Sequence, residues 1–369
     1  MAQLTESTAR GIVGAKRPAI SPDGSKIAFQ YRGDIYVVSA EGGVATQITN
    51  HVELDTNPIW SPDGKWIAFS SDRNGNLDVF AVPLAGGEIR QLTYSGFDEV
   101  ATDWSPDGRW ITFAARREAL WTGIFVLDVR TLRFRMLSMD YQGYSEPHFS
   151  PDGKTIVAIR HGFPWTRPRY NGSAAAKLVL IDVATGKVRS LVQDDRQHLW
   201  PLFAPDGRFV YTVTYGDVTP SVTWLNKEPT KFQDTADRTP NLWRLDLNGQ
   251  GRRITNAVGA AIRWPSISKD GTLVYERDGR IYRFANGKEA EGPIRVYGDQ
   301  KTTTWSRRVF TSGAEEAEVS PDAKTFAFRV GSELWAVPLE KPDNRNKDDA
   351  TRLTGYPGID EDFTWDAEG

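Results

Sequence analysis

The sequence contains no cysteine, which excludes disulfide bonds and any chemistry that needs a thiolate. It has no apolar run close to the ~18 residues that a membrane-spanning helix requires. No long stretch repeats its apolar residues with a period of 3.6, so no long amphipathic helix is predicted. The formal net charge of −3 gives no sign of nucleic-acid binding. Four histidines in 369 residues leave few candidates for acid–base catalysis or metal binding.

A short motif instead recurs along almost the whole chain. The stretch WSPDGKWIAF at residues 60–69 has counterparts at 20–29, 104–113, 149–158, 203–212, 267–276 and 319–328. Self-similarity at intervals of 40 to 64 residues is typical of repeat architectures. The aspartate of the motif, Asp63 in the second copy, recurs in all seven. We therefore interpret it as part of the fold and not as a catalytic carboxylate.

The SPDG tetrapeptide has the composition of a tight β-hairpin turn. Serine can hydrogen-bond to the backbone two residues on, proline presets φ, and glycine supplies a positive φ. Strand-like residues flank the turn, Pro58 to Trp60 before it and Trp66 to Phe69 after it. The strand after the turn is apolar on both faces, as expected for a sheet that is covered on each side.

Each unit then continues in the same order, with an alternating strand, a glycine-rich turn and, in several units, a short fourth strand. In the second unit these are Asp78 to Val82, Ala85 to Gly87 and Gln91 to Thr93. Four short strands in a unit of about 40–60 residues indicate the blade of a β-propeller. We therefore predict an all-β fold, a β-propeller of seven four-stranded blades around a central channel, with six blades as the alternative.

The predicted propeller spans residues 18–354, with units beginning near 18, 58, 102, 147, 201, 265 and 317. Residues 1–17 form an N-terminal segment, in which Gln3 to Thr5 echoes a fourth strand and could help to close the ring. Residues 355–369 match the beginning of a further repeat. From this match we expect the chain to continue in a longer polypeptide.

Candidate catalytic residues are scarce. The nearest approach to a nucleophile elbow is the stretch from Gly143 to Pro147 around Ser145, which lacks the second glycine. His51, His148 and His198 lie at or before first strands, where they could approach the channel and hold a metal. The alternative is that they are hydrogen-bonded or surface residues of separate blades. We predict no catalytic residue, no cofactor and no metal.

Three insertions stand out, at residues 160–177, 214–240 and 297–317. Loops from second to third strands and from fourth to first strands emerge at one end of a propeller, so all three insertions should crowd one mouth of the channel, which we call the insertion end. Aromatic and basic residues on such loops are typical of binding surfaces. The alternative is that they only pack the loops onto the ring. The candidates are Trp165, Arg167, Arg169, Tyr170, Trp224, Lys227, Lys231, Trp305, Arg307 and Arg308.

The repeat resembles those of TolB, of dipeptidyl peptidase propellers and of tricorn proteases. The segments NLWRLDLNGQGRRIT, RWPSISKDGTLVYERDGRIYRF, GPIRV and EVSPDAKTFAFRVGSELWAVP together resemble the first propeller of tricorn-type serine peptidases. The resemblance covers nearly all of residues 18–354. Two departures matter: that propeller has six blades, whereas seven units are counted here, and the peptidase domains of the family have no counterpart in this sequence.

The resemblance implies a non-catalytic role within a larger serine peptidase. The propeller would guide or filter peptide substrates, or dock a protein partner such as the adjoining peptidase domains. Two alternatives remain open. One is a TolB-like protein-interaction scaffold without any catalytic domain. The other is a propeller-type carbohydrate lyase, which needs clustered histidines and a bound metal in the channel.

Overall fold

The fold consists of β-strands. A computed structural model describes residues 9–117, 121–138, 143–160, 176–194, 196–215, 239–297, 314–330, 333–339, 350–354 and 363–365. These ranges contain strands β1 to β31 and no helix, which confirms the all-β prediction. It follows that the described part of the chain has no helix of the length and apolar character needed to cross a membrane.

Seven of the sheets have four antiparallel strands, and each is built from strands of one predicted unit. The strands are consecutive in every sheet but the first, which omits β5. Each predicted starting point falls inside the first strand of its sheet. The first three sheets are β2 (Lys16–Ile20), β3 (Lys26–Tyr31), β4 (Asp34–Ser39) and β6 (Thr46–Gln47); β7 (Asp55–Trp60), β8 (Trp66–Ser71), β9 (Asp78–Pro83) and β10 (Arg90–Gln91); and β11 (Glu99–Trp104), β12 (Trp110–Ala115), β13 (Gly123–Asp128) and β14 (Phe134–Met136).

The remaining four-stranded sheets follow the same plan. They are β15 (Tyr144–Phe149), β16 (Thr155–Arg160), β17 (Lys177–Asp182) and β18 (Val188–Ser190); β19 (His198–Phe203), β20 (Phe209–Thr214), β21 (Asn241–Asp246) and β22 (Gly251–Arg253); β23 (Arg263–Ile267), β24 (Leu273–Arg277), β25 (Arg280–Ala285) and β26 (Lys288–Glu291); and β28 (Ala314–Val319), β29 (Thr325–Val330), β30 (Glu333–Pro338) and β31 (Thr351–Arg352).

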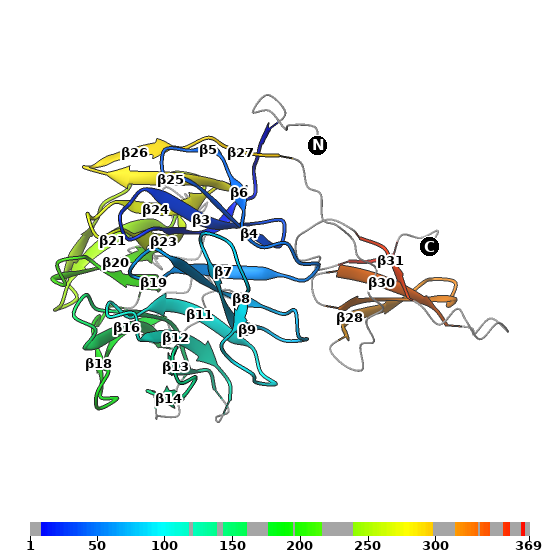
Figure 1. Cartoon of the computed structure of the whole chain (residues 1–369), viewed down its shortest axis with the longest axis horizontal. Coiled ribbons are helices and arrows are strands. Elements are labelled where there is room, and N and C mark those ends of the chain that lie inside the picture. The colour runs from blue at the N-terminus through cyan, green and yellow to red at the C-terminus, as the bar shows by residue number, and fades with distance from the viewer. Residues whose placement is uncertain are drawn as a thin grey trace, which may run out of the picture.

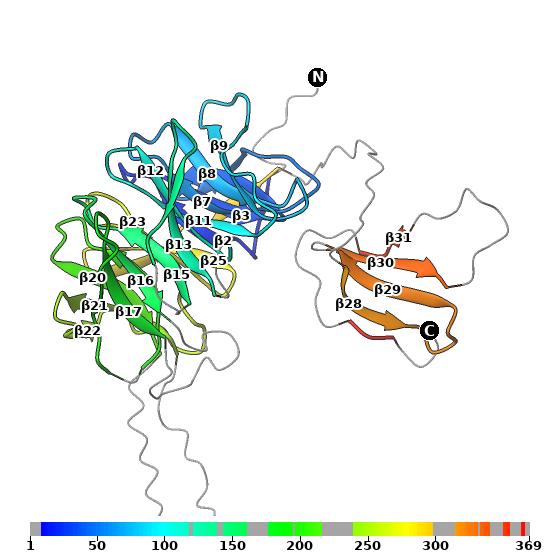
Figure 2. The same ribbon diagram turned by 90° about the horizontal axis from the view of Figure 1, so that it is seen from below.

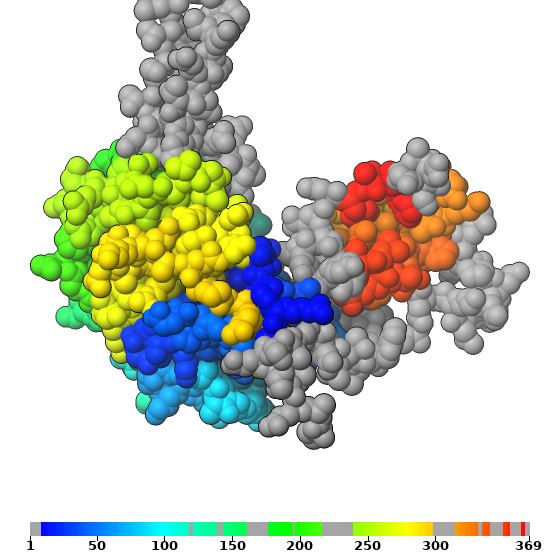
Figure 3. Space-filling view, turned by 90° about the horizontal axis from the view of Figure 1, so that it is seen from above, coloured from blue at the N-terminus to red at the C-terminus, as the bar shows by residue number. Residues whose placement is uncertain are grey.

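The ring closes with six of these sheets. The first strands β2, β7, β11, β15, β19 and β23 contact one another in chain order, and β23 contacts β2. Figures 1 and 3 show the blue first sheet directly beside the yellow sixth sheet. The orange sheet β28 to β31 stands beside the ring (Figure 2). The seven-blade count is therefore not confirmed, although all seven units form sheets.

The sequence of the seventh unit explains why it stands apart. Its first strand, AEEAEV, is exposed along its whole length, whereas β19, HLWPLF, is buried along its whole length. Strand β28 carries three glutamates, two of which pair with Arg329 of β29. All three would meet neighbouring blades if this sheet were inserted into the ring, and taking charged groups out of water is costly even when they are paired. The place next to β2 is moreover already taken by β23.

A small clasp holds the two ends of the ring together. Strand β27 (Ile294–Val296), which follows the sixth blade, pairs antiparallel with β1 (Arg10–Gly11) and parallel with β5 (Gly43–Val44). The Ala45 N–H extends the pairing by donating to the Arg295 carbonyl at 2.8 Å. An N-terminal segment thus takes part in closure outside the blades themselves, whereas Gln3 to Thr5 lie outside the described residues.

The SPDG turns are structural, as the repetition indicated. Ser61 Oγ donates to Asp63 Oδ1 at 2.6 Å and accepts the Trp66 N–H at 2.9 Å. The Lys65 N–H donates to the same carboxylate oxygen at 3.1 Å, and Gly64 has φ = +70°. The serine therefore bonds to the aspartate side chain, and not to the backbone two residues on as the sequence suggested. These bonds, that from Ser61 first, lower the pKa of Asp63.

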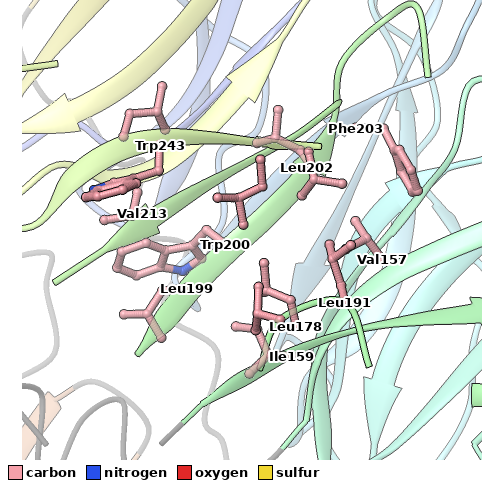
Figure 4. Packing of buried hydrophobic residues seen from close by; sticks show 14 of the residues in the cluster. Val157, Ile159, Leu178, Leu191, Leu199, Trp200, Leu202, Phe203, Val213 and Trp243 are labelled. Carbon is pink, nitrogen blue, oxygen red and sulfur yellow. The ribbon is translucent and has the colours of Figure 1, made fainter. Parts of the chain in front are cut away.

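Packing between neighbouring blades forms the core. Cross-strand aromatic pairs stack in the middle of the blades, for example Phe69 with Phe80 and Phe113 with Phe125. The largest cluster joins the fourth, fifth and sixth blades, and Figure 4 shows its side chains converging from neighbouring strands. Adjacent residues of β8, such as Ile67 and Ala68, are both fully buried. The second strands are thus covered on both faces, as predicted.

Candidate functional site

A cavity of about 480 Å³ lies between the first strands of the six blades. All six of these strands contribute to its wall, so the cavity is the central channel of the ring. Its volume falls within the range of small-molecule binding sites, roughly 300–1,000 Å³. The fold directs side chains from all six first strands into it.

Each first strand carries a β-bulge, and the bulge residues line the channel. The antiparallel register of every first strand shifts by one residue near its middle. A bulge inserts an unpaired residue and redirects a side chain, which explains its frequency near functional sites. The six bulge residues in the channel wall are Arg17, Asn57, Thr102, Glu146, Trp200 and Trp264.

Five of these bulge residues have an unusual backbone conformation. Arg17, Asn57, Glu146, Trp200 and Trp264 have φ between +46° and +53°. Each precedes a proline, and a proline at a bulge removes an N–H that the ladder would not use. A non-glycine residue with positive φ costs about 1–3 kcal/mol and tends to cluster at functional sites. The same strained backbone conformation thus recurs in five blades and places five side chains in one channel.

Two opposite charges face each other across this ring of bulges. Arg17 belongs to the first blade and Glu146 to the fourth, three steps apart in a ring of six. Burial lowers the pKa of Arg17, and the charge of Glu146 opposes that shift. Burial likewise raises the pKa of Glu146, and the charge of Arg17 opposes it. Each group thus favours the charged form of the other inside the channel.

A carboxyl–imidazole pair, Asp103 and His148, lies on the side of the channel that carries Glu146. His148 Nδ1 is 3.8 Å from Asp103 Oδ2, and the two side chains are 22% and 30% exposed. Burial raises the pKa of Asp103 to about 7, against the hydrogen bonds donated by the Phe149 and Trp104 N–H groups. Burial lowers the pKa of His148 to about 4. Between pH 4 and pH 7 Asp103 is therefore protonated and His148 is unprotonated, so both side chains are neutral.

The cavity reaches the end of the ring that carries the SPDG turns, opposite the insertion end, which we call the SPDG end. Pro22, Pro62 and the matching prolines of three further turns lie in its wall, and Lys269 takes that place in the sixth blade. The Lys269 N–H donates to the Pro22 carbonyl, and its ammonium donates to the Pro62 carbonyl, both at 3.1 Å. The SPDG end is therefore not uniform, because the sixth unit places Lys269 where the other five place a proline.

The sequence-predicted binding residues lie outside the described residues. This applies to Trp165, Arg167, Arg169, Tyr170, Trp224, Lys227, Lys231, Trp305, Arg307 and Arg308, so their role stays a prediction. The described loops of the insertion end nevertheless expose apolar side chains. Val52, Tyr94, Phe97, Trp121 and Val258 are 41% to 77% exposed.

The three candidate histidines are not brought together. His148 lines the channel, whereas His51 Nδ1 accepts the Glu53 N–H in a loop. His198 lies between Thr214 Oγ1 and Asp194 Oδ1, each at 2.9 Å. Among the described residues no group of three histidine or acidic side chains is placed to hold a metal. The lyase alternative therefore has no support from these histidines.

The chain Thr214–His198–Asp194 has the residue types of a catalytic triad, but its setting is structural. The Thr214 and His198 side chains are fully buried between paired strands β20 and β19. His198 occupies the place of Asp55 in the second blade, which binds Arg73 at 2.8 Å. A buried hydroxyl cannot meet a substrate, so this chain serves to join the two strands.

Sequence reasoning missed the channel residues, although a signal was present. Proline at the same place in five first strands marks the bulge, and the residue before it faces the channel. The pattern Arg17-Pro18, Glu146-Pro147 and Trp264-Pro265 would have identified them. A proline within a strand usually marks an edge or an end, so without the ring these prolines indicate only where a strand begins.

Relatives of known structure share this architecture. The crystal structure of the tricorn protease aligns with 93% of this chain and 31% of its own, at a TM-score of 0.58 and 17% identity. The putative TolB from Agrobacterium tumefaciens aligns with 73% of this chain and 84% of its own, at a TM-score of 0.54 and 19% identity. At these identities the likeness shows the fold.

A curated relative is named as a peptidase. The uncharacterized peptidase YuxL of Bacillus subtilis (strain 168) is 29% identical over 248 residues, which make up 56% of this chain and 30% of that protein. This chain thus spans less than a third of that relative's length. Residues 14–290 match the family described as the tricorn protease N-terminal β-propeller domain. The match covers the six closed blades almost end to end, and the chain belongs to this family of β-propeller domains.

Proposed function

We propose that this chain is a non-catalytic propeller domain of a tricorn-like peptidase, and that it binds peptide substrates, or docks the adjoining peptidase domains, through the insertion end. The observation that carries the proposal is the set of exposed apolar side chains at that end. Tyr94, Phe97 and Trp121 come from loops of the second and third blades. Aromatic side chains on loops held by a rigid scaffold are typical of binding surfaces.

The family supports the part of the proposal that assigns cleavage to other domains. The tricorn protease is a peptidase, and its aligned region makes up 31% of its chain. The Thr214–His198 pair is buried, so its hydroxyl cannot act on a substrate. We propose that cleavage is performed by other domains and that this domain selects what reaches them.

A second candidate is a TolB-like scaffold that binds a protein partner and has no catalytic domain. The alignment with 84% of the putative TolB favours it. The reading frame downstream of Gly369 separates the two candidates, since only the first requires a serine peptidase domain there.

The test is the binding of a labelled, unstructured peptide to purified protein, followed by fluorescence anisotropy. A double variant, Tyr94→Ser with Trp121→Ser, should weaken binding at least tenfold, because truncating an interface anchor costs about 2 kcal/mol or more. Leu132→Ser is the matched control, since Leu132 is an exposed apolar residue in a third-to-fourth-strand turn at the opposite end. Weakened binding in the control alone would place the surface at the SPDG end.

The residues predicted from sequence supply a second pair of variants. Arg167→Ala with Arg169→Ala should reduce affinity, because arginine can bind a peptide carboxylate through two parallel hydrogen bonds. Lys65→Ala with Lys154→Ala, beside two SPDG turns, should not. The reverse result would mean that the functional face has been assigned to the wrong end.

A further inference from the structure

The charged pair in the channel has no hydrogen-bonding partner among the described residues. Among the described residues, neither the Arg17 guanidinium nor the Glu146 carboxylate makes a hydrogen bond or an ion pair. Both groups lie deep in the ring and face the cavity. A charge taken out of bulk water is costly unless it is paired. Two such charges, held on opposite walls by strained bulges, suggest that their partner is a ligand.

An aromatic wall adjoins the guanidinium. The Arg17 side chain stacks on the Trp264 ring, with 5.0 Å between its Cζ atom and the ring centroid. The ring centroids of Trp200 and Trp264 are 5.9 Å apart, and the rings are tilted by 59°. These residues belong to the first, fifth and sixth blades, which are neighbours in the ring. One side of the channel is thus cationic and aromatic, and the opposite side carries Glu146 and Asp103.

We propose that the channel, at the level of the six bulges, binds a short zwitterionic peptide; this inference deepens the proposed peptide-binding function. The carboxylate of the peptide binds Arg17, its ammonium binds Glu146, and an apolar side chain packs against Trp200 and Trp264.

Each part of this ligand matches one wall. A guanidinium binds a carboxylate through two parallel charge-assisted hydrogen bonds. Indole rings offer a large apolar surface to an aliphatic or aromatic side chain. The cavity volume of about 480 Å³ suits a ligand of two or three residues rather than a folded partner. A ligand with both charges neutralises both walls at once, which a singly charged peptide cannot do.

The experiment measures the binding of the tripeptide Ala-Ala-Phe to the full chain by calorimetry. Its C-terminal amide and its N-acetyl form, each lacking one charge, should bind at least tenfold more weakly. Hydrogen bonds to charged groups contribute about 1.5–3 kcal/mol, which corresponds to a 10- to 150-fold change in affinity. Because these comparisons use unchanged protein, they do not depend on whether any variant folds.

Variants then assign each charge to its wall. Arg17→Gln should weaken binding of the free tripeptide but leave binding of the amide unchanged. Glu146→Gln should weaken binding of the free tripeptide but leave binding of the acetylated peptide unchanged. Arg252→Gln, an exposed arginine on β22, is the control that removes one positive charge elsewhere. The proposal is overturned if the free tripeptide does not bind, or if the free, amidated and acetylated forms bind equally.

The outcome is separable from the test of the proposed function. Binding of a long peptide at the insertion end depends on Tyr94 and Trp121, whereas the tripeptide test depends on Arg17 and Glu146. Either kind of binding can therefore be absent while the other is present.

Discussion

Ring closure can be tested at one glycine. Gly42 lies in the turn between the third strand of the first blade and the clasp strand β5, with φ = +90°. A Cβ added there would lie 2.7 Å from the Pro293 carbonyl oxygen and 3.0 Å from the Pro293 nitrogen. That carbonyl accepts the Gly43 N–H at 2.9 Å, so it cannot shift without weakening the clasp. Gly42→Ala should therefore destabilise the ring at its closure.

Gly86 is the matched control. It occupies the corresponding turn of the second blade with φ = +85°, but a Cβ there would meet nothing within 4 Å. Both substitutions incur the cost of a left-handed alanine, about 1–2 kcal/mol. Only Gly42→Ala adds an overpacking term, about 1–3 kcal/mol.

The assay is thermal unfolding of the wild type and both variants, with amide hydrogen exchange at Gly43 and Ala45. In a domain of more than 250 residues 1 kcal/mol corresponds to roughly 2 °C in Tm. Gly42→Ala should melt several degrees below Gly86→Ala, and its clasp amides should exchange faster. If the two variants melt together with unchanged exchange, the sixth blade does not pack against the first through this clasp.

Three further predictions follow from the turns and the channel. Asp63→Ala removes two accepted hydrogen bonds and should lower the free energy of unfolding by about 1–2 kcal/mol in urea titrations; a much larger loss would mean that the turn has another role. Because its pKa is raised to about 7 on folding, Asp103 stabilises the fold at acid pH and loses that contribution as pH rises from 4 through 7. Relative to Asp103→Asn, the wild type should thus lose about 2 kcal/mol between pH 5 and pH 8, after a discount for partial exposure; equal pH profiles would show an ordinary carboxyl. Lys269→Ala removes a side chain that reaches across the SPDG mouth, so tripeptide association by stopped-flow Trp fluorescence should accelerate severalfold, and an unchanged rate would indicate entry from the other end.

Most of the fold could be predicted because it depends on local patterns. The SPDG turn is determined within about six residues, so seven copies predicted seven sheets with their strands in the right places. Ring closure is a long-range property. It depends on β27, three residues long, pairing with segments that lie more than 240 residues earlier in the chain. No local pattern contains that information, although the glutamates of β28 gave a hint that the seventh unit does not belong between two blades.

The channel residues could not be selected for a similar reason. Whether Arg17 or Glu146 matters depends on which blades face each other, and that changes between a ring of six and a ring of seven. In a six-bladed ring the first and fourth blades are opposite, and their charges face across the channel. Sequence reasoning instead favoured the insertions, whose aromatic and basic residues are visible without knowing the ring.

The most direct test of the proposed role combines binding with chemistry in one sample. A labelled unstructured peptide of about 15 residues is mixed with the purified chain, its anisotropy is followed to equilibrium, and its mass is measured after a day. The account predicts saturable binding and an intact peptide, because the proposed role is to select substrates for cleavage by other domains. Absence of binding, or cleavage that disappears when a single serine or histidine is replaced, would contradict it.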